Sequence, residues 1–212
     1  YKSQHRGGRG ISGLSTRDED FVENIFVTSS HNYILFFTNK GRMYKLKTYQ
    51  IPEAGRQAKG SAIVNLLPIE KDEKITAVIP IKEFEENKYL TMLTKRGVIK
   101  KTDLTDYDTI RKGGLIAIGL REDDELIHVE LTDGDNNIIV GTKKGICIRF
   151  KESDVRPMGR GASGVKAITL NDDDFVVGAG CCKEGADILT ITENGYGKKT
   201  DLEEFKIQNR GG

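Results

Sequence analysis

Short apolar runs alternate with polar residues along the whole chain, and none continues at helical spacing for long enough to predict an amphipathic helix. Pairs of these runs flank a four-residue turn that begins with Thr and ends with Gly. This pattern is typical of a β-hairpin whose glycine supplies a positive φ. The glycines of the four turns are 56, 48 and 50 residues apart: TNKG (38–41), TKRG (94–97), TKKG (142–145) and TENG (192–195). This spacing predicts an internal repeat of about 50 residues.

A second series of segments, which we call the glycine loops, has the same period and combines glycines with cations. The series comprises QHRGGRG (4–10), AGRQAKG (54–60), IRKGGLI (110–116), MGRGASG (158–164) and QNRGG (208–212). Strand-like segments follow these loops: AIVNLLPI (62–69), LIAIGL (115–120) and VKAITL (165–170). An acidic turn and a further apolar stretch come next. One unit therefore reads as strand, turn, strand, glycine loop, strand, acidic turn, strand.

Four strands per unit, repeated without helices, predict an all-β fold of propeller-like architecture. A single four-stranded unit cannot bury both of its faces, so we expect the units to pack against one another in one domain over residues 1–212. The approximate repeat units are 4–53, 54–109, 110–157 and 158–207.

Composition limits the classes of protein to consider. The chain has 33 Lys and Arg against 32 Asp and Glu, so its net charge of +1 gives no support to a nucleic-acid partner. Its three cysteines show no C-x-x-C spacing, which favours a reducing, cytoplasmic location. No apolar run approaches the roughly 18 residues that span a bilayer, so no membrane partner is expected.

The distribution of charge says more than the net charge. A cation stands four residues after each turn glycine: Lys45, Lys101, Arg149 and Lys199. Carboxylates concentrate in the acidic turns, at 70–73, 122–125 and 172–174. The screening length is about 8 Å at physiological ionic strength, so a basic rim well away from these turns could bind a polyanion. Regular spacing favours duplex DNA, although lysine is also an ordinary choice for the exposed face of a strand.

Motifs that suggest other chemistry lack the necessary context. GRGISG (8–13) and GRGASG (159–164) match the dinucleotide fingerprint G-x-G-x-x-G, but no βαβ frame surrounds them. DGDNN (133–137) resembles half of a calcium loop, yet the twelfth position is Lys144. The three histidines are scattered, so neither a metal site nor a catalytic constellation is predicted.

QHRGGRG resembles the box that marks the C-terminal domain of DNA gyrase A: Gln, two basic residues, Gly-Gly, a basic residue and Gly. His5 stands where the family usually has Arg or Lys. Similarity extends over essentially the whole chain, through DEDFVENIFVTSSHNYILFFTNKGRMYKLK, GSAIVNLLPI, VRPMGRGASGV and ITENGYGKKTDLEEF. The corresponding domain of topoisomerase IV is the alternative, but its box is usually degraded.

The resemblance implies a β-pinwheel, here of about four blades where the family commonly has six, so the chain is expected to be an excerpt. It implies a non-catalytic domain around which double-stranded DNA wraps with little sequence preference, so that the holoenzyme can introduce negative supercoils. No cofactor is expected in this domain. The breakage tyrosine, ATP and Mg²⁺ belong to the remaining gyrase A and B regions, which are the expected protein partners of this otherwise monomeric fragment.

The residues expected to bind DNA are the box and the repeated cations. They are Gln4, His5, Arg6, Gly7, Gly8, Arg9, Gly10, Lys40, Arg42, Lys45, Arg56, Lys59, Arg96, Lys101, Lys112, Lys144, Arg149, Arg160, Lys198, Lys199 and Arg210. The box could either contact DNA or hold neighbouring blades together. A propeller-like scaffold that binds an acidic protein remains a further alternative.

Overall fold

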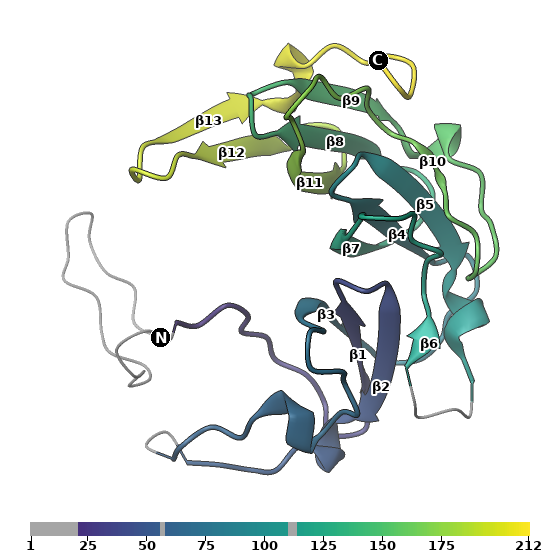
Figure 1. Ribbon diagram of the computed structural model, residues 1–212, viewed down its shortest axis with the longest axis vertical. Coiled ribbons are helices and arrows are strands. Elements are labelled where there is room, and N and C mark those ends of the chain that lie inside the picture. Colours follow the sequence, from purple (N-terminus) through teal and green to yellow (C-terminus); the bar gives the residue numbers. More distant parts are fainter. Residues whose placement is uncertain (1–20, 56–57, 110–113) are drawn as a thin grey trace.

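The computed structural model describes residues 21–55, 58–109 and 114–212 (Figure 1). Its elements in these ranges are β-strands and short 3-10 helices, and its sheets follow one another along an arc. The prediction of an all-β repeat fold is confirmed. No helix in the described ranges has the length and apolar character needed to cross a membrane.

The first sheet is built around the hairpin of β1 (Tyr33–Thr38) and β2 (Arg42–Lys47). On one side β1 pairs antiparallel with β3 (Ile75–Ile81), and on the other side β2 pairs with β6 (Leu115–Ile116). The strand order is therefore β3-β1-β2-β6. Because β6 follows the next hairpin in the chain, this sheet borrows a strand from a later repeat.

The second sheet repeats this arrangement with the order β10-β5-β4-β7. Its strands are β4 (Tyr89–Thr94), β5 (Val98–Asp103), β7 (Leu126–Thr132) and β10 (Val165–Lys166). The third sheet contains β8 (Asn137–Thr142), β9 (Cys147–Lys151) and β11 (Val176–Cys182), and the fourth contains β12 (Asp187–Ile191) and β13 (Gly197–Asp201). We call these sheets the first to fourth blades. The exchanged strands β6 and β10 identify the fold as a β-pinwheel.

A 3-10 helix follows the second strand of each hairpin. These are η1 (Thr48–Gln50), η3 (Leu104–Tyr107), η4 (Glu152–Asp154) and η5 (Leu202–Glu204). The fifth, η2 (Ile63–Asn65), lies in the segment where the sequence predicts a strand at 62–69. That strand prediction is wrong. β6 and β10 are strands because each pairs with the second hairpin strand of an earlier repeat, and the described residues offer 62–69 no such partner.

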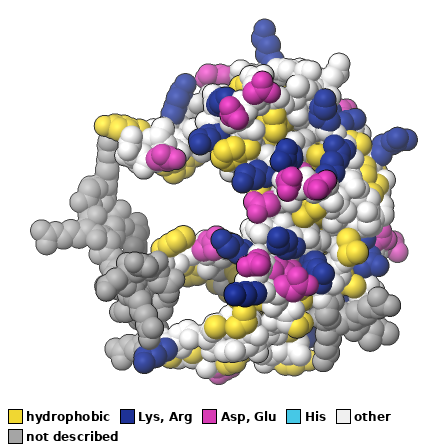
Figure 2. Space-filling view, in the orientation of Figure 1, with side chains coloured by type: hydrophobic (Ala, Val, Ile, Leu, Met, Phe, Trp, Pro, Cys, Tyr) yellow, Lys and Arg dark blue, Asp and Glu magenta, His cyan; other side chains and the backbone are white. Residues whose placement is uncertain are grey.

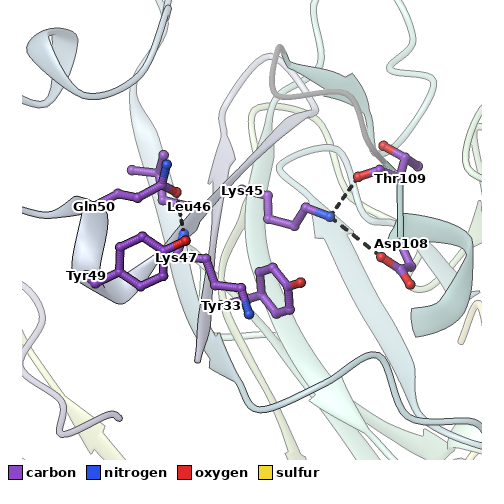
Figure 3. Close-up of a pocket in the computed structure, with 8 residues that line it drawn as sticks. All are labelled: Tyr33, Lys45, Leu46, Lys47, Tyr49, Gln50, Asp108 and Thr109. Carbon is purple, nitrogen blue, oxygen red and sulfur yellow. Dashed lines mark hydrogen bonds and ion pairs between the residues drawn. The ribbon is translucent and has the colours of Figure 1, made fainter. Parts of the chain in front are cut away.

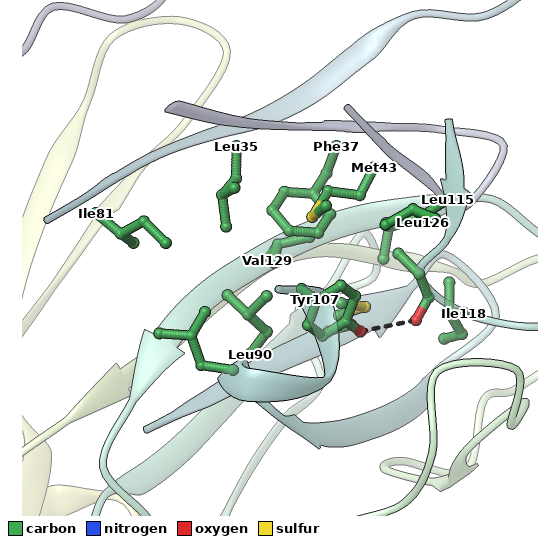
Figure 4. Close-up of a cluster of buried hydrophobic side chains, with 13 residues drawn as sticks. Leu35, Phe37, Met43, Ile81, Leu90, Tyr107, Leu115, Ile118, Leu126 and Val129 are labelled. Atoms are coloured by element: carbon green, nitrogen blue, oxygen red, sulfur yellow. Dashed lines mark hydrogen bonds between the residues drawn. The ribbon is translucent and has the colours of Figure 1, made fainter. Parts of the chain in front are cut away.

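Neighbouring blades pack against one another through shared clusters of buried apolar side chains. On β1, Leu35 and Phe37 point into a cluster that also contains Leu90 and Val129 of the second blade (Figure 4). The alternate residues Ile34 and Phe36 belong to another cluster, and a third joins the second and third blades. Both faces of the central strands are therefore buried, which explains why they read as continuous apolar runs.

The turn glycines are needed for more than their positive φ. Gly41 and Gly97 have φ of 71° and 76°. A Cβ at Gly41 would lie 2.9 Å from the Cγ2 atom of Ile118, and one at Gly97 would lie 2.9 Å from that of Ile168. The segment after each exchanged strand therefore passes directly over the hairpin turn of the earlier blade, where only glycine leaves room.

The sequence repeats and the blades do not coincide. Unit 4–53 contributes β1 and β2 to the first blade, whereas β3 comes from 54–109 and β6 from 110–157. Three repeats therefore contribute to this blade, and its two edge strands, β3 and β6, come from different repeats.

Candidate nucleic-acid interface

The cation four residues after the second turn glycine is buried. Lys101 is 4% exposed. Its Nζ donates a hydrogen bond to the Glu152 carbonyl (3.2 Å) and lies 3.9 Å from that residue's Oε1 and 5.0 Å from the ring centroid of Tyr89. Glu152 begins η4 of the following repeat. Lys101 therefore joins its own hairpin to the 3-10 helix of the next unit.

Arg149, at the same place in the third hairpin, is 2% exposed. Its guanidinium donates to the carbonyls of Leu202 (2.8 Å), the first residue of η5, and Phe205 (3.1 Å), just after it, and to the carboxylate of Glu203 (3.1 and 3.3 Å). Its Nε donates to Asn137 Oδ1 of its own hairpin (3.2 Å). The third repeat is thus joined to the fourth by the same geometry.

Lys45 makes the corresponding contact from the first hairpin, in the pocket drawn in Figure 3. Its Nζ donates to the Thr109 carbonyl (2.7 Å) and lies 3.6 Å from Asp108 Oδ1, just beyond η3. Lys199, the fourth member of the series, differs. It is exposed and forms an ion pair with Asp187 of its own hairpin (2.7 Å).

We call Lys45, Lys101 and Arg149 the interblade cations. The expectation that their series lies on an exposed basic rim is wrong for Lys101 and Arg149, because this position faces the 3-10 helix of the next repeat. The sequence contained one signal that Lys101 is buried against the next repeat. Glu152 occupies a place that is Leu104 and Leu202 in the neighbouring repeats, and a carboxylate at an otherwise apolar position indicates a buried partner.

The hairpin turns do not form a basic rim separate from the acidic turns. Arg42 lies 3.3 Å from Glu70. Arg96 Nε donates to the Asp123 carbonyl (2.9 Å), and Lys144 Nζ to the Asp172 carbonyl (2.6 Å). The two kinds of turn are neighbours because the strand after each acidic turn pairs antiparallel with the first hairpin strand. In Figure 2 basic and acidic side chains are interspersed on the face in view. The predicted separation of charge is wrong.

The acidic turn at 70–73 has a structural role instead. Glu73 is 5% exposed and accepts hydrogen bonds from the Thr38 hydroxyl (2.6 Å) and the Tyr44 hydroxyl (2.9 Å). Burial alone would raise the pKa of this carboxyl, but the hydrogen bonds from Thr38, the Glu70 backbone and Tyr44 hold it below its usual value. Burial, with Glu73 beside it, raises the pKa of Tyr44 to about 12.

Two glycine loops span neighbouring blades. In 158–164, the Met158 N–H donates to the Lys101 carbonyl (2.8 Å), and the Ala162 carbonyl accepts from the Gly119 N–H (3.0 Å). In 208–212, the Gln208 N–H donates to the Arg149 carbonyl (2.8 Å) and the Gly211 N–H to the Ala167 carbonyl (3.0 Å). Both loops thus run from the second hairpin strand of one blade to the segment that follows an exchanged strand.

A buried lysine supports the first of these loops. Lys100 is fully buried, and its Nζ donates to the carbonyls of Ala117 (2.6 Å) and Arg160. Tyr107 donates to the same Ala117 carbonyl (3.0 Å). Burial and the nearby charge of Arg160 lower the pKa of Lys100 to about 8, although Asp106 opposes the shift. Nothing in the sequence singled out this lysine.

The same loops carry cations on the outer edge of the arc, beside β10 (Figure 1). Arg210 Nη1 donates to the Lys166 carbonyl (2.6 Å), so the loop at 208–212 lies directly against this strand. Arg156, just before the first loop, and Arg160 within it correspond to Lys206 and Arg210 fifty residues later. We call the set the outer-edge cations: Arg156, Arg160, Lys166, Lys206 and Arg210. Arg156, Lys166 and Lys206 are exposed, and the other two are half-buried.

Arg160 and Arg210 were among the residues predicted from the sequence to bind DNA. The three exposed members of this set were not. The fifty-residue offset could have revealed Arg156 and Lys206. Lys40, Lys59 and Lys198 are exposed elsewhere. The predicted residues Gln4, His5, Arg6, Gly7, Gly8, Arg9, Gly10, Arg56 and Lys112 lie outside the described residues.

Among the described side chains, no group of three or more His, Cys, Asp or Glu is placed to hold a metal ion. What the structure does define is a repeat domain, a β-pinwheel whose outer edge carries cations on successive glycine loops. The chain belongs to the family described as DNA gyrase C-terminal domain, beta-propeller, which matches residues 1–29, 32–82, 88–133, 136–183 and 186–212.

Known proteins similar to the chain agree with this assignment. The DNA gyrase A protein of Clostridium acetobutylicum is 61% identical over the whole chain, which covers 26% of that protein. The crystal structure of the C-terminal domain of DNA topoisomerase IV has a TM-score of 0.84 at 33% identity, covering 94% of this chain and 62% of that one. For a DNA gyrase A C-terminal domain the TM-score is 0.75 at 29% identity, with 94% and 65% covered. The chain spans about a quarter of the length of the curated relatives.

Proposed function

We propose that the chain is the non-catalytic DNA-binding and DNA-wrapping domain of a DNA gyrase A protein. The observation that carries this proposal is the recurrence of cations in and beside consecutive glycine loops along the outer, convex edge of the arc (Figure 1). Phosphates of a duplex recur at regular intervals, so cations that recur with the blades can neutralise them without reading the base sequence.

A convex basic edge also explains why several blades are needed. Smooth bending of a 20–30 bp site by 40–90° costs about 1–6 kcal/mol, which phosphate contacts distributed along the arc offset. In the parent enzyme the bent duplex presents a crossing segment for strand passage, and negative supercoils result. The strand-breaking, ATP and Mg²⁺ chemistry belongs to the remaining A and B regions, with which this domain would act in the cytoplasm.

The structure of the glycine loops favours a particular role for the box QHRGGRG. The loops at 158–164 and 208–212 hydrogen-bond to two blades through their backbones and present their cations beside them. By analogy, residues 4–10 would both hold blades together and supply Arg6 and Arg9 to the duplex. The two roles left open by the sequence are therefore compatible.

The first test is the binding of a duplex by the triple variant Arg156→Gln, Lys166→Gln, Lys206→Gln. The matched control is Lys71→Gln, Lys74→Gln, Lys82→Gln, which removes the same charge from exposed positions away from β10. If each lost cation contacts one phosphate, the slope of log K against log[salt] should become shallower by about 0.9 per cation in the first variant only. Equal slopes in the two variants would refute the assignment of this edge.

An equivalent domain of topoisomerase IV is the second candidate, and the TM-score of 0.84 with such a domain favours it. The two can be separated by relaxing circular DNA with topoisomerase I in the presence of the chain. A trapped linking change of positive sign is expected of a gyrase-type wrap. Binding without a trapped change would leave a DNA-binding domain that does not wrap chirally.

A further inference from the structure

We propose that the interblade cations Lys45, Lys101 and Arg149 are positioning residues that fix the angle between consecutive blades and thereby the path of bound DNA. This inference rests on the proposed function for its DNA part. Its structural part rests on one geometry that appears three times: a cation on the second hairpin strand donates to a backbone carbonyl at the 3-10 helix of the next repeat and forms an ion pair with a carboxylate there.

The apolar clusters between blades cannot supply this directionality by themselves. Hydrophobic burial is roughly proportional to the area removed from water and does not depend on direction, so it holds two blades together at more than one relative orientation. Charge-assisted hydrogen bonds to fixed carbonyls are directional. The Lys101–Glu152 pair is buried at both ends, and such a pair adds little to stability but can specify a single arrangement.

Each cation contacts its own hairpin as well as the next repeat, so its side chain is held more firmly than in an ordinary surface ion pair. Lys45 and Lys101 lie over the Tyr33 and Tyr89 rings of their own hairpins at 5.1 and 5.0 Å, and Arg149 donates to Asn137 at the corresponding place. The other end of each contact belongs to the next repeat. Movement of one blade relative to the next would therefore break these bonds.

The same residues connect the blade angle to the outer-edge cations. The backbone carbonyl of Lys101 accepts from the Met158 N–H, and that of Arg149 accepts from the Gln208 N–H. Arg160 and Arg210 follow two residues later in each loop. The side chains that orient the blades thus lie on the residues whose main chain anchors the loops that present cations to DNA.

The test separates DNA bending from DNA binding with Arg149→Met. This change removes the contacts to η5 and leaves Glu203 with a solvent-exposed carboxylate (60% exposed), so no charge is left buried. Arg149→Lys is the conservative variant. Lys82→Met is the control, because it removes an exposed lysine that lies away from the outer-edge cations.

For Lys101 the double variant Lys101→Met, Glu152→Gln removes the ion pair but keeps a side-chain oxygen at position 152 that can accept from the Thr132 hydroxyl and the Gly134 N–H. Folding of every variant is checked by thermal unfolding. Affinity is measured for a duplex of about 12 bp, roughly one helical turn, and for one of about 30 bp that can be bent. Bending of the longer duplex is followed by energy transfer between its labelled ends.

We expect Arg149→Met and the double variant to bind the short duplex within about twofold of the parent, and to bind the long duplex about tenfold more weakly with less bending. Arg149→Lys should restore part of the bend, and Lys82→Met should leave it unchanged. Equal losses on both duplexes would show a phosphate contact and overturn the inference, as would an unchanged bend. If the parent chain binds neither duplex, the proposed function itself fails.

Discussion

Lys100 shows how one repeat position can take different chemistry according to its neighbours. The residue three places after the turn glycine is Tyr44 in the first hairpin, Lys100 in the second and Ile148 in the third, and all three are buried. Tyr44 donates to the carboxylate of Glu73, Lys100 donates to two carbonyls, and Ile148 packs in an apolar cluster. The fold fixes the position, and local partners decide which side chain is stable there.

The burial of Lys100 predicts an unusual pH dependence of stability. The pKa of Lys100 falls from 10.5 to about 8 on folding, so between these values the unfolded chain holds more protons. The contribution of Lys100 to the free energy of unfolding is therefore fully present above pH 10.5 and is lost as the pH falls to about 8. The free energy of unfolding of the parent relative to Lys100→Met should rise with pH, by at most about 1.4 kcal/mol per unit.

Urea unfolding at pH 7, 8, 9 and 10 measures this difference directly, and the comparison with the variant cancels the titration of other groups. Lys198→Met changes the corresponding but exposed lysine and should show no such trend. A parent-variant difference that is constant or falls with pH would mean that Lys100 is not held in the environment described above.

Among the strands, the hairpins are the units that the chain repeats and the exchanged strands are what joins them. β6 and β10 are only two residues long. Each nevertheless completes a sheet whose other strands are an earlier hairpin and the strand paired with its first strand, β3 or β7. So short a strand contributes few ladder bonds. The central strands β1, β4 and β8, with both faces buried, contribute more of the apolar core than these exchanged strands do.

This division predicts unequal costs for the same truncation on paired strands. Leu90 of β4 is fully buried, and Leu131, its cross-strand partner on β7, is 37% exposed. Leu90→Ala should lower the free energy of unfolding by about 2–5 kcal/mol, because it leaves a cavity between the first two blades. Leu131→Ala should cost well under about 2 kcal/mol, since much of its side chain already faces water. Similar midpoints in denaturant unfolding would argue against this core.

Over the molecule as a whole the net charge is only +1, and on the face drawn in Figure 2 cations and carboxylates are interspersed. Long-range attraction of DNA by the net charge is consequently weak. Under the proposed function, binding would depend instead on the few outer-edge cations that come within the screening length of a phosphate. The curvature of the arc then decides how many blades one duplex can contact.

If about six cations reach phosphates, affinity for a duplex should fall about a thousandfold between 50 and 200 mM salt. The loss should be nearly the same for duplexes of unrelated sequence, because phosphates carry no sequence information. Titrations at several salt concentrations with two unrelated duplexes test both statements. A flat salt response, or a strong preference for one sequence, would contradict phosphate contact as the basis of binding.

Much of the fold was predictable because its signals are local. Each turn glycine, apolar run and acidic turn is encoded within a few residues, and their recurrence every 50 residues or so indicated an all-β repeat domain. The exception, 62–69, has a strand-like pattern but no strand partner in the described residues. The site was less predictable. Recurrence marked Lys101 and Arg149 as special, but it could not say whether a repeated cation faces solvent or the next repeat.

The linear order of residues was enough to establish the hairpins, the period and the kinship with the gyrase C-terminal domain, since these depend on residues close together in the chain. The folded arrangement was needed to learn which cations are buried, which turns are neighbours and which loops lie on the outer edge. Those properties depend on pairings between residues about 50 positions apart, where strand exchange brings Lys101 beside Glu152 and Arg149 beside Glu203. Contacts between repeats, which no single repeat contains, therefore separate the structural cations from those available to DNA.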